Sequence, residues 1–142
     1  MHPLPIETEQ EAAVAILFAS IMNEQAGLTQ SQIEQLSRML VLSSKFKEHS
    51  LNDLTIKALS LQAAHGSKAI IEHSAQFISE DFRETLFAMA CEIITADGKV
   101  NDRESEVLAM IALYMGMSME RMKMMLTTYL IRNRWNVQVI EQ

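Results

Sequence analysis

Hydrophobic residues recur three and four positions apart along nearly the whole chain, a spacing typical of amphipathic α-helices. The spacing predicts a first helix from about Thr8 to Ala26 and a second that begins at Thr29, followed by a polar connection over residues 43–50. In the first helix the apolar positions form one stripe, made of Val14, Leu17, Phe18, Ile21 and Met22. No segment alternates with the period of two that marks a β-strand.

Capping and stop residues divide the rest of the chain into five further helices. The expected N-caps of the third to seventh helices are Asn52, Ser67, Ser79, Asn101 and Ser118. Glycines are expected to end two of these helices, Gly66 the third and Gly116 the sixth. The sequence therefore predicts an all-α bundle of about seven helices.

Two of the predicted turns follow the same order of residue types. Each has a glycine, an apolar residue, a helix cap, and Gln or Glu three residues after the cap. The first turn runs through Gly27, Leu28, Thr29 and Gln32, and the second through Gly98, Val100, Asn101 and Glu104. The shared spacing favours an internal pseudo-two-fold repeat of helical hairpins, over about residues 8–66 and 79–135, within one domain spanning residues 1–142.

Composition indicates a globular protein, because 49% of the 142 residues are hydrophobic and 21% are charged. The single cysteine, Cys91, excludes an internal disulfide and falls among apolar helical positions, so we expect a buried, inert thiol. The N-terminus lacks the basic and apolar regions of a signal peptide, and no apolar run reaches the roughly 20 residues of a membrane span. We expect a cytoplasmic protein.

The net charge of −6 argues against a nucleic-acid partner. Between residues 80 and 106 there are eight acidic and three basic side chains, a balance of −5 that leaves open a cation, a basic partner or a solvated face. Near the C-terminus, Arg132, Arg134 and Trp135 form a basic and aromatic end that is too short to support nucleic-acid binding.

The acidic turn before the sixth helix resembles only the second half of a calcium-binding EF-hand loop. With Gly98 at loop position six, Glu104 takes position twelve, but Ile93 and Thr95 fall where carboxylates are required. A looser calcium or magnesium site remains open, with oxygen ligands from Asp97, Glu104, Asp102 and Glu92. The alternative is helix capping, because Glu104 lies three residues after Asn101, as a capping box requires.

Six methionines crowd residues 115–125, around the start of the seventh helix. Helical spacing places Met122 on the core stripe, whereas Met117, Met119 and Met124 are candidates for partner binding. Soft copper(I) coordination is a third interpretation of the cluster. The four histidines form no ligand pattern and no nucleophile stands in a recognisable catalytic motif, so we expect no enzymatic activity.

The segment from Ala96 to Glu104, followed by Leu108, Ile111, Ala112 and Gly116-Met117-Ser118, resembles the tellurite-resistance TerB family. The same fold occurs as a domain of a DnaJ-type co-chaperone. The resemblance implies a duplicated all-α bundle in a cytoplasmic, non-enzymatic protein of a stress or metal response. It also implies a cation site at the acidic turn, carried over to Asp97 and Glu104.

The first turn departs from the family pattern, because Ala26 and Gln32 stand where Asp and Glu are expected. If the cation site needs both turns, this chain has lost it. The competing hypothesis is a protein-interaction scaffold with no metal, whose partner and oligomeric state the sequence does not identify.

Overall fold

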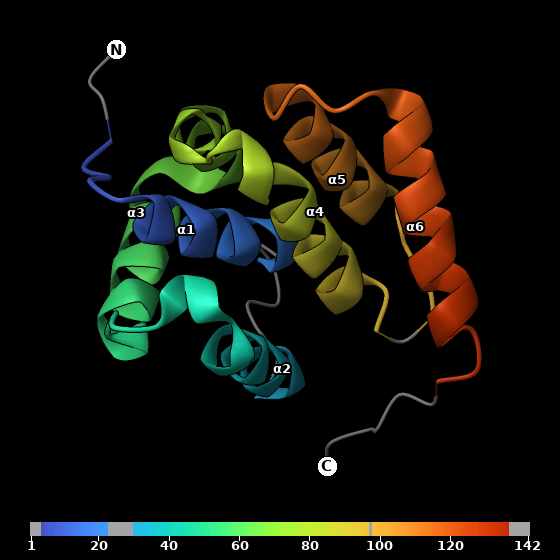
Figure 1. Ribbon diagram of the computed structural model, residues 1–142, viewed down its shortest axis with the longest axis horizontal. Coiled ribbons are helices and arrows are strands. Elements are labelled where there is room, and N and C mark those ends of the chain that lie inside the picture. Colours follow the sequence, from blue (N-terminus) through green and yellow to red (C-terminus); the bar gives the residue numbers. More distant parts are fainter. Residues whose placement is uncertain (1–3, 23–29, 97, 137–142) are drawn as a thin grey trace.

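The computed structural model describes residues 4–22, 30–96 and 98–136. Within these ranges the chain is all helical, with six α-helices, two short 3₁₀-helices and no strand (Figure 1). In chain order they are α1 (Glu9–Ile21), α2 (Gln30–Leu42), η1 (Ser44–Phe46), α3 (Leu51–Ser74), η2 (Ala75–Phe77), α4 (Glu80–Ile94), α5 (Asp102–Tyr114) and α6 (Met119–Asn133). The predicted all-α class is confirmed, and the count is close to the predicted seven.

Helix α1 is the centre of the packing. Every residue from Ala12 to Ile21 is buried, and the helix packs against α3, α4, α5 and η2. The predicted single stripe is therefore wrong, because a helix without charged residues over this length is buried on all sides. Small side chains let the neighbouring helices approach closely, and Ser20 satisfies its hydroxyl by donating to the Leu17 carbonyl at 2.6 Å.

Local capping patterns hold at most of the helix starts. Thr8 and Glu11 form a complete capping box on α1, and Ser118 accepts the Arg121 N–H at the start of α6. The third cap is Ser50 and not the predicted Asn52, because the Ser50 hydroxyl accepts the Asp53 N–H at 3.2 Å. The backbone turns extended at Met22, so α1 ends before the predicted Ala26.

The predicted third and fourth helices are both present: α3 consists of two helical segments that meet at a break at Gly66, where the third helix was predicted to end. Gly66 has φ 79° and ψ 167°, a conformation that glycine adopts without steric cost. The Ser67 hydroxyl was expected to cap a new helix, but it donates to the Ala19 carbonyl of α1 at 3.0 Å. The kink thus fastens the middle of α3 to α1.

The internal repeat stays a prediction, as does the division into repeats at residues 8–66 and 79–135. Its first turn contains Ala26, Gly27, Leu28 and Thr29, which lie outside the described residues.

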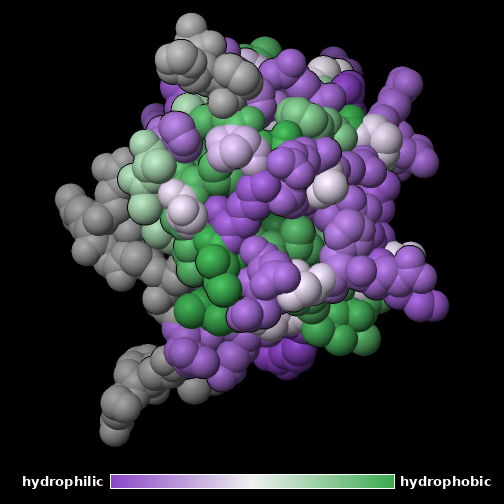
Figure 2. All heavy atoms as spheres, turned by 90° about the vertical axis from the view of Figure 1, so that its left-hand side faces the viewer, coloured by the Kyte–Doolittle hydropathy of each residue, from purple (hydrophilic) through white to green (hydrophobic). Residues whose placement is uncertain are grey.

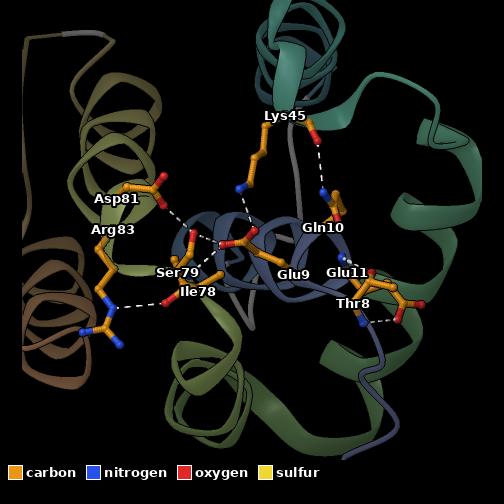
Figure 3. Close-up of polar contacts among 9 residues, drawn as sticks. All are labelled: Thr8, Glu9, Gln10, Glu11, Lys45, Ile78, Ser79, Asp81 and Arg83. Atoms are coloured by element: carbon orange, nitrogen blue, oxygen red, sulfur yellow. Dashed lines mark hydrogen bonds and ion pairs between the residues drawn. The ribbon is translucent and has the colours of Figure 1, made fainter.

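The start of α1 is joined to two distant segments through Glu9 (Figure 3). Its carboxylate accepts hydrogen bonds from the Ser79 backbone N–H and hydroxyl, both at 2.6 Å, and pairs with Lys45 at 2.6 Å. The Lys45 ammonium also lies 4.8 Å from the ring centre of Phe82. Ser79 opens α4 as predicted, but a carboxylate from α1 caps the helix in place of the serine side chain.

Burial alone would raise the pKa of Glu9, but the hydrogen bonds from Lys45 and Ser79 outweigh it, so the pKa lies below its ordinary value of 4.5. The ionised carboxylate is therefore the form that stabilises the fold.

The molecular surface is mixed in character. On the face that Figure 2 shows, hydrophilic side chains predominate and hydrophobic ones form small groups between them. Among the described helices, none has both the length and the apolar content that crossing a bilayer demands.

We predict that Glu9→Gln lowers the free energy of unfolding by about 1–2 kcal/mol at pH 7, since charge-assisted hydrogen bonds are lost. The folded pKa is depressed, so this contribution is complete above pH 4.5 and disappears as the pH falls through the folded value. Urea unfolding at pH 7 and in acid should show the gap between wild type and variant closing in acid. Glu72→Gln, at an exposed α3 position, is the control that should change little at either pH.

Candidate functional site at the α4–α5 turn and α6

The acidic turn joins α4 to α5 through two caps. Thr95 is the C-cap of α4 and Asn101 the N-cap of α5. The Asn101 side chain accepts the Glu104 N–H at 2.8 Å, and a Glu104 carboxylate oxygen accepts the Asn101 N–H at 3.0 Å. This is the predicted capping box, and it engages one oxygen of a predicted metal ligand.

The C-terminal end of α6 closes on this turn. The buried Asn133 amide donates to the Thr95 hydroxyl at 3.1 Å, and Thr95 in turn donates to the Cys91 carbonyl at 2.6 Å. Asn136 donates to the Ala96 carbonyl at 3.0 Å. Sequence reasoning missed this contact, although Asn133 stands as a polar residue on the stripe of Met122, Leu126 and Tyr129.

The contact between the turn and the end of α6 requires a glycine at position 98. Its φ is +81°, and a Cβ atom built on it would lie 2.7 Å from the Asn133 carbonyl oxygen and 3.3 Å from the Arg134 backbone. Any other residue would strain the turn and also push the end of α6 away. The turn motif therefore has a packing role that does not depend on a ligand.

Two other predicted carboxylates, Asp102 and Glu92, lie on different helices. Asp102 is exposed in the first turn of α5, where negative charge is favourable, and Glu92 is exposed in the last turn of α4. Over residues 4–22, 30–96 and 98–136, no three His, Cys, Asp or Glu side chains converge as a metal ion would require. Asp97 lies outside the described residues, so the predicted four-carboxylate site stays a prediction.

A complete EF-hand is incompatible with the positions of its would-be first ligands. Ile93 is buried in the core, and the Thr95 hydroxyl is engaged by Cys91 and Asn133.

An arginine side chain links the turn to α1. The Arg103 guanidinium, in the first turn of α5, donates to the Met22 carbonyl, which is the C-cap of α1. A positive charge at the C-terminal end of a helix is favourable, because the carbonyl groups there carry partial negative charge. The acidic turn is thus held by α1 on one side and by α6 on the other.

The methionine cluster divides between core and surface. Met115 and Met122 are buried, and Met117 and Met125 are partly buried against the core. Met119 and Met124 are each 53% exposed. Two of the three predicted partner-binding methionines are therefore accessible, and Met117 contributes mainly to packing.

Cys91 is fully buried, and burial raises its pKa to about 12. The expected burial of the thiol is confirmed, and the raised pKa favours its protonated form at neutral pH. Burial also raises the pKa of Tyr129 on α6, and the negative charge of Glu92 adds to this effect.

Residues 11–126 match the family described as "Tellurite resistance protein TerB". This match covers most of the chain, so the protein belongs to the TerB family, as its turn motif indicated. Neither the curated proteins nor the solved structures give a significant match.

We predict that Gly98→Ala destabilises the fold more than Gly66→Ala does. Both glycines have positive φ, but a Cβ at Gly66 meets no atom within 4 Å, whereas one at Gly98 overlaps the Asn133 carbonyl. The shared backbone strain costs about 1 kcal/mol, and the overlap adds about 1–3 kcal/mol at Gly98 only. Equal shifts of the urea midpoint in the two variants would contradict the tight contact between the turn and α6.

Proposed function

We propose that this TerB-family chain is a non-enzymatic docking protein of a cytoplasmic stress response of the tellurite-resistance type. The observation that carries the proposal is the exposure of Met119 and Met124 on α6, next to the buried Met115 and Met122. Long, flexible thioether side chains suit a surface that adapts to a partner.

The methionines stand on a helix that is held at both ends. Ser118 caps its first turn, Arg121 pairs with Glu84 of α4 at 2.5 Å, and Asn133 bonds to Thr95 at its other end. A docking surface on a fixed helix loses little conformational freedom when it binds, which favours affinity. The protonated, buried state of Cys91, the only thiol of the chain, supports a non-enzymatic role.

The second candidate function is binding of a divalent cation, calcium or magnesium, at the acidic turn. It is favoured by the contacts that hold the turn, from Asn133, Asn136 and Arg103, because a pre-ordered turn offers its oxygens without an ordering cost. Asp97, Asp102 and Glu104 are the proposed ligands, with Glu92 at the end of α4 as a fourth. The competing scaffold hypothesis assigns these residues to capping alone.

We predict that a protein partner co-purified with the chain is released by Met119→Glu and by Met124→Glu. Each change places a charge where an apolar contact is proposed, while both positions are exposed and tolerate it in the fold. Leu42→Glu, at an 86% exposed position on α2, is the matched control and should retain the partner. Capture that survives both methionine changes would remove α6 as the docking surface.

We predict that calcium or magnesium stabilises the folded state of EDTA-treated protein, by about 2.7 kcal/mol at 100 times the dissociation constant. The thermal unfolding midpoint should therefore rise. Asp97→Asn or Asp102→Asn should abolish the rise, while Glu72→Gln should not, because it lies on α3. A midpoint that no divalent cation moves would assign the carboxylates to capping only.

A further inference from the structure

The outer side of α6 carries a line of exposed apolar side chains that the core does not use. Met124 is 53% exposed, Ile131 is 57% exposed, and Trp135, two residues after the helix, is 88% exposed. Their spacings of seven and four residues place them on one side of a helix. That side is opposite the buried Met122 and Asn133, which face the core.

Basic side chains flank this apolar line. Helical geometry places Lys123 and Arg134 along one edge and Arg132 along the other, and all three are exposed. Within the part of the chain that the structure describes, none of the three takes part in an ion pair. The basic and aromatic end found in the sequence is thus one end of a longer surface, defined here as the α6 face: Lys123, Met124, Ile131, Arg132, Arg134 and Trp135.

The α6 face is opposite in charge to the rest of the protein. Residues 119–135 contain four Lys or Arg and one Glu, which gives +3. The whole chain carries −6, so the remainder carries −9. An unpaired basic surface with apolar side chains at its centre is complementary to an acidic partner that has an apolar stripe.

We propose that the α6 face binds an acidic amphipathic helix of a partner protein. The inference rests on the docking function proposed above and gives the chemistry of the partner. From Met124 to Trp135 the apolar line spans about 16 Å, the length of three helical turns. A helix with apolar residues at matching intervals and Asp or Glu on either side would fill the line and meet both basic edges.

Two other occupants fit the charges less well. An anionic membrane would also be attracted to the basic edges, but Thr127 and Thr128 interrupt the apolar line that would have to enter the lipid. A second copy joined through the same face would bring the two sets of cations together.

The test uses Trp135, the only tryptophan of the chain, whose fluorescence reports directly on this face. The probe is a synthetic helical peptide of about 18 residues, with Leu along one stripe and Glu on the flanks. We expect a blue shift of emission on titration and about tenfold weaker binding for the double variant R132E/R134E. The control K47E/K68E makes the same change of charge at exposed positions outside α6 and should bind much as the wild type does.

Three results of the titration would overturn the proposal. The first is the absence of a blue shift with the Glu peptide, and the second is an equal blue shift with a matched Lys peptide. The third is a blue shift with phosphatidylglycerol vesicles but none with the Glu peptide. A natural partner whose capture depends on Met119 but is unaffected by R132E/R134E would also reject the acidic helix, while leaving the docking function in place. If the partner is still captured by the methionine variants and by R132E/R134E, both the docking function and the acidic-helix proposal are rejected.

Discussion

The complete burial of α1 is the constraint on which the rest of the structure depends. A helix with no solvent-facing side needs a neighbour on every side, and α3, α4, α5 and η2 fill those positions. Charged groups then fix the neighbours at its two ends. Glu9 holds the start of α4 and η1, and Arg103 holds the start of α5. The apolar helix sets which elements meet, and the polar contacts at its ends set how they are aligned.

The family's turn motif has a structural explanation that is independent of any ligand. Gly98 is fixed by the approach of the Asn133 carbonyl, and Glu104 is fixed by the Asn101 backbone N–H. The motif therefore positions α6 against α4, and α6 carries the exposed side chains through which we propose that the protein docks. Cation binding, where it occurs, acts on an element already in contact with that helix. The acidic turn therefore lies against the same end of α6 that carries Arg132, Arg134 and Trp135 of the α6 face.

The sequence predicted features that depend on neighbouring residues, such as the capping box at Asn101, the cap at Ser118 and the stop at Gly116. It failed where distant residues decide. The burial of α1 on all sides requires three later helices, and Ser79 is capped by a carboxylate 70 residues earlier. Asn133 was missed because its partner, Thr95, lies 38 residues away. The methionines could be divided only in part, since spacing identified Met122 as core but exposure depends on how α6 packs against α4 and α5.

The central place of α1 also has a consequence for how the chain folds during synthesis. This helix is synthesised before the helices that cover it, and the last of these, α5, ends at Tyr114. At 5–20 residues per second, the apolar surface of α1 waits about 5–20 s for its final partner. Throughout that time it is exposed to aggregation and available to holding chaperones, so the rate of translation influences the yield of folded protein.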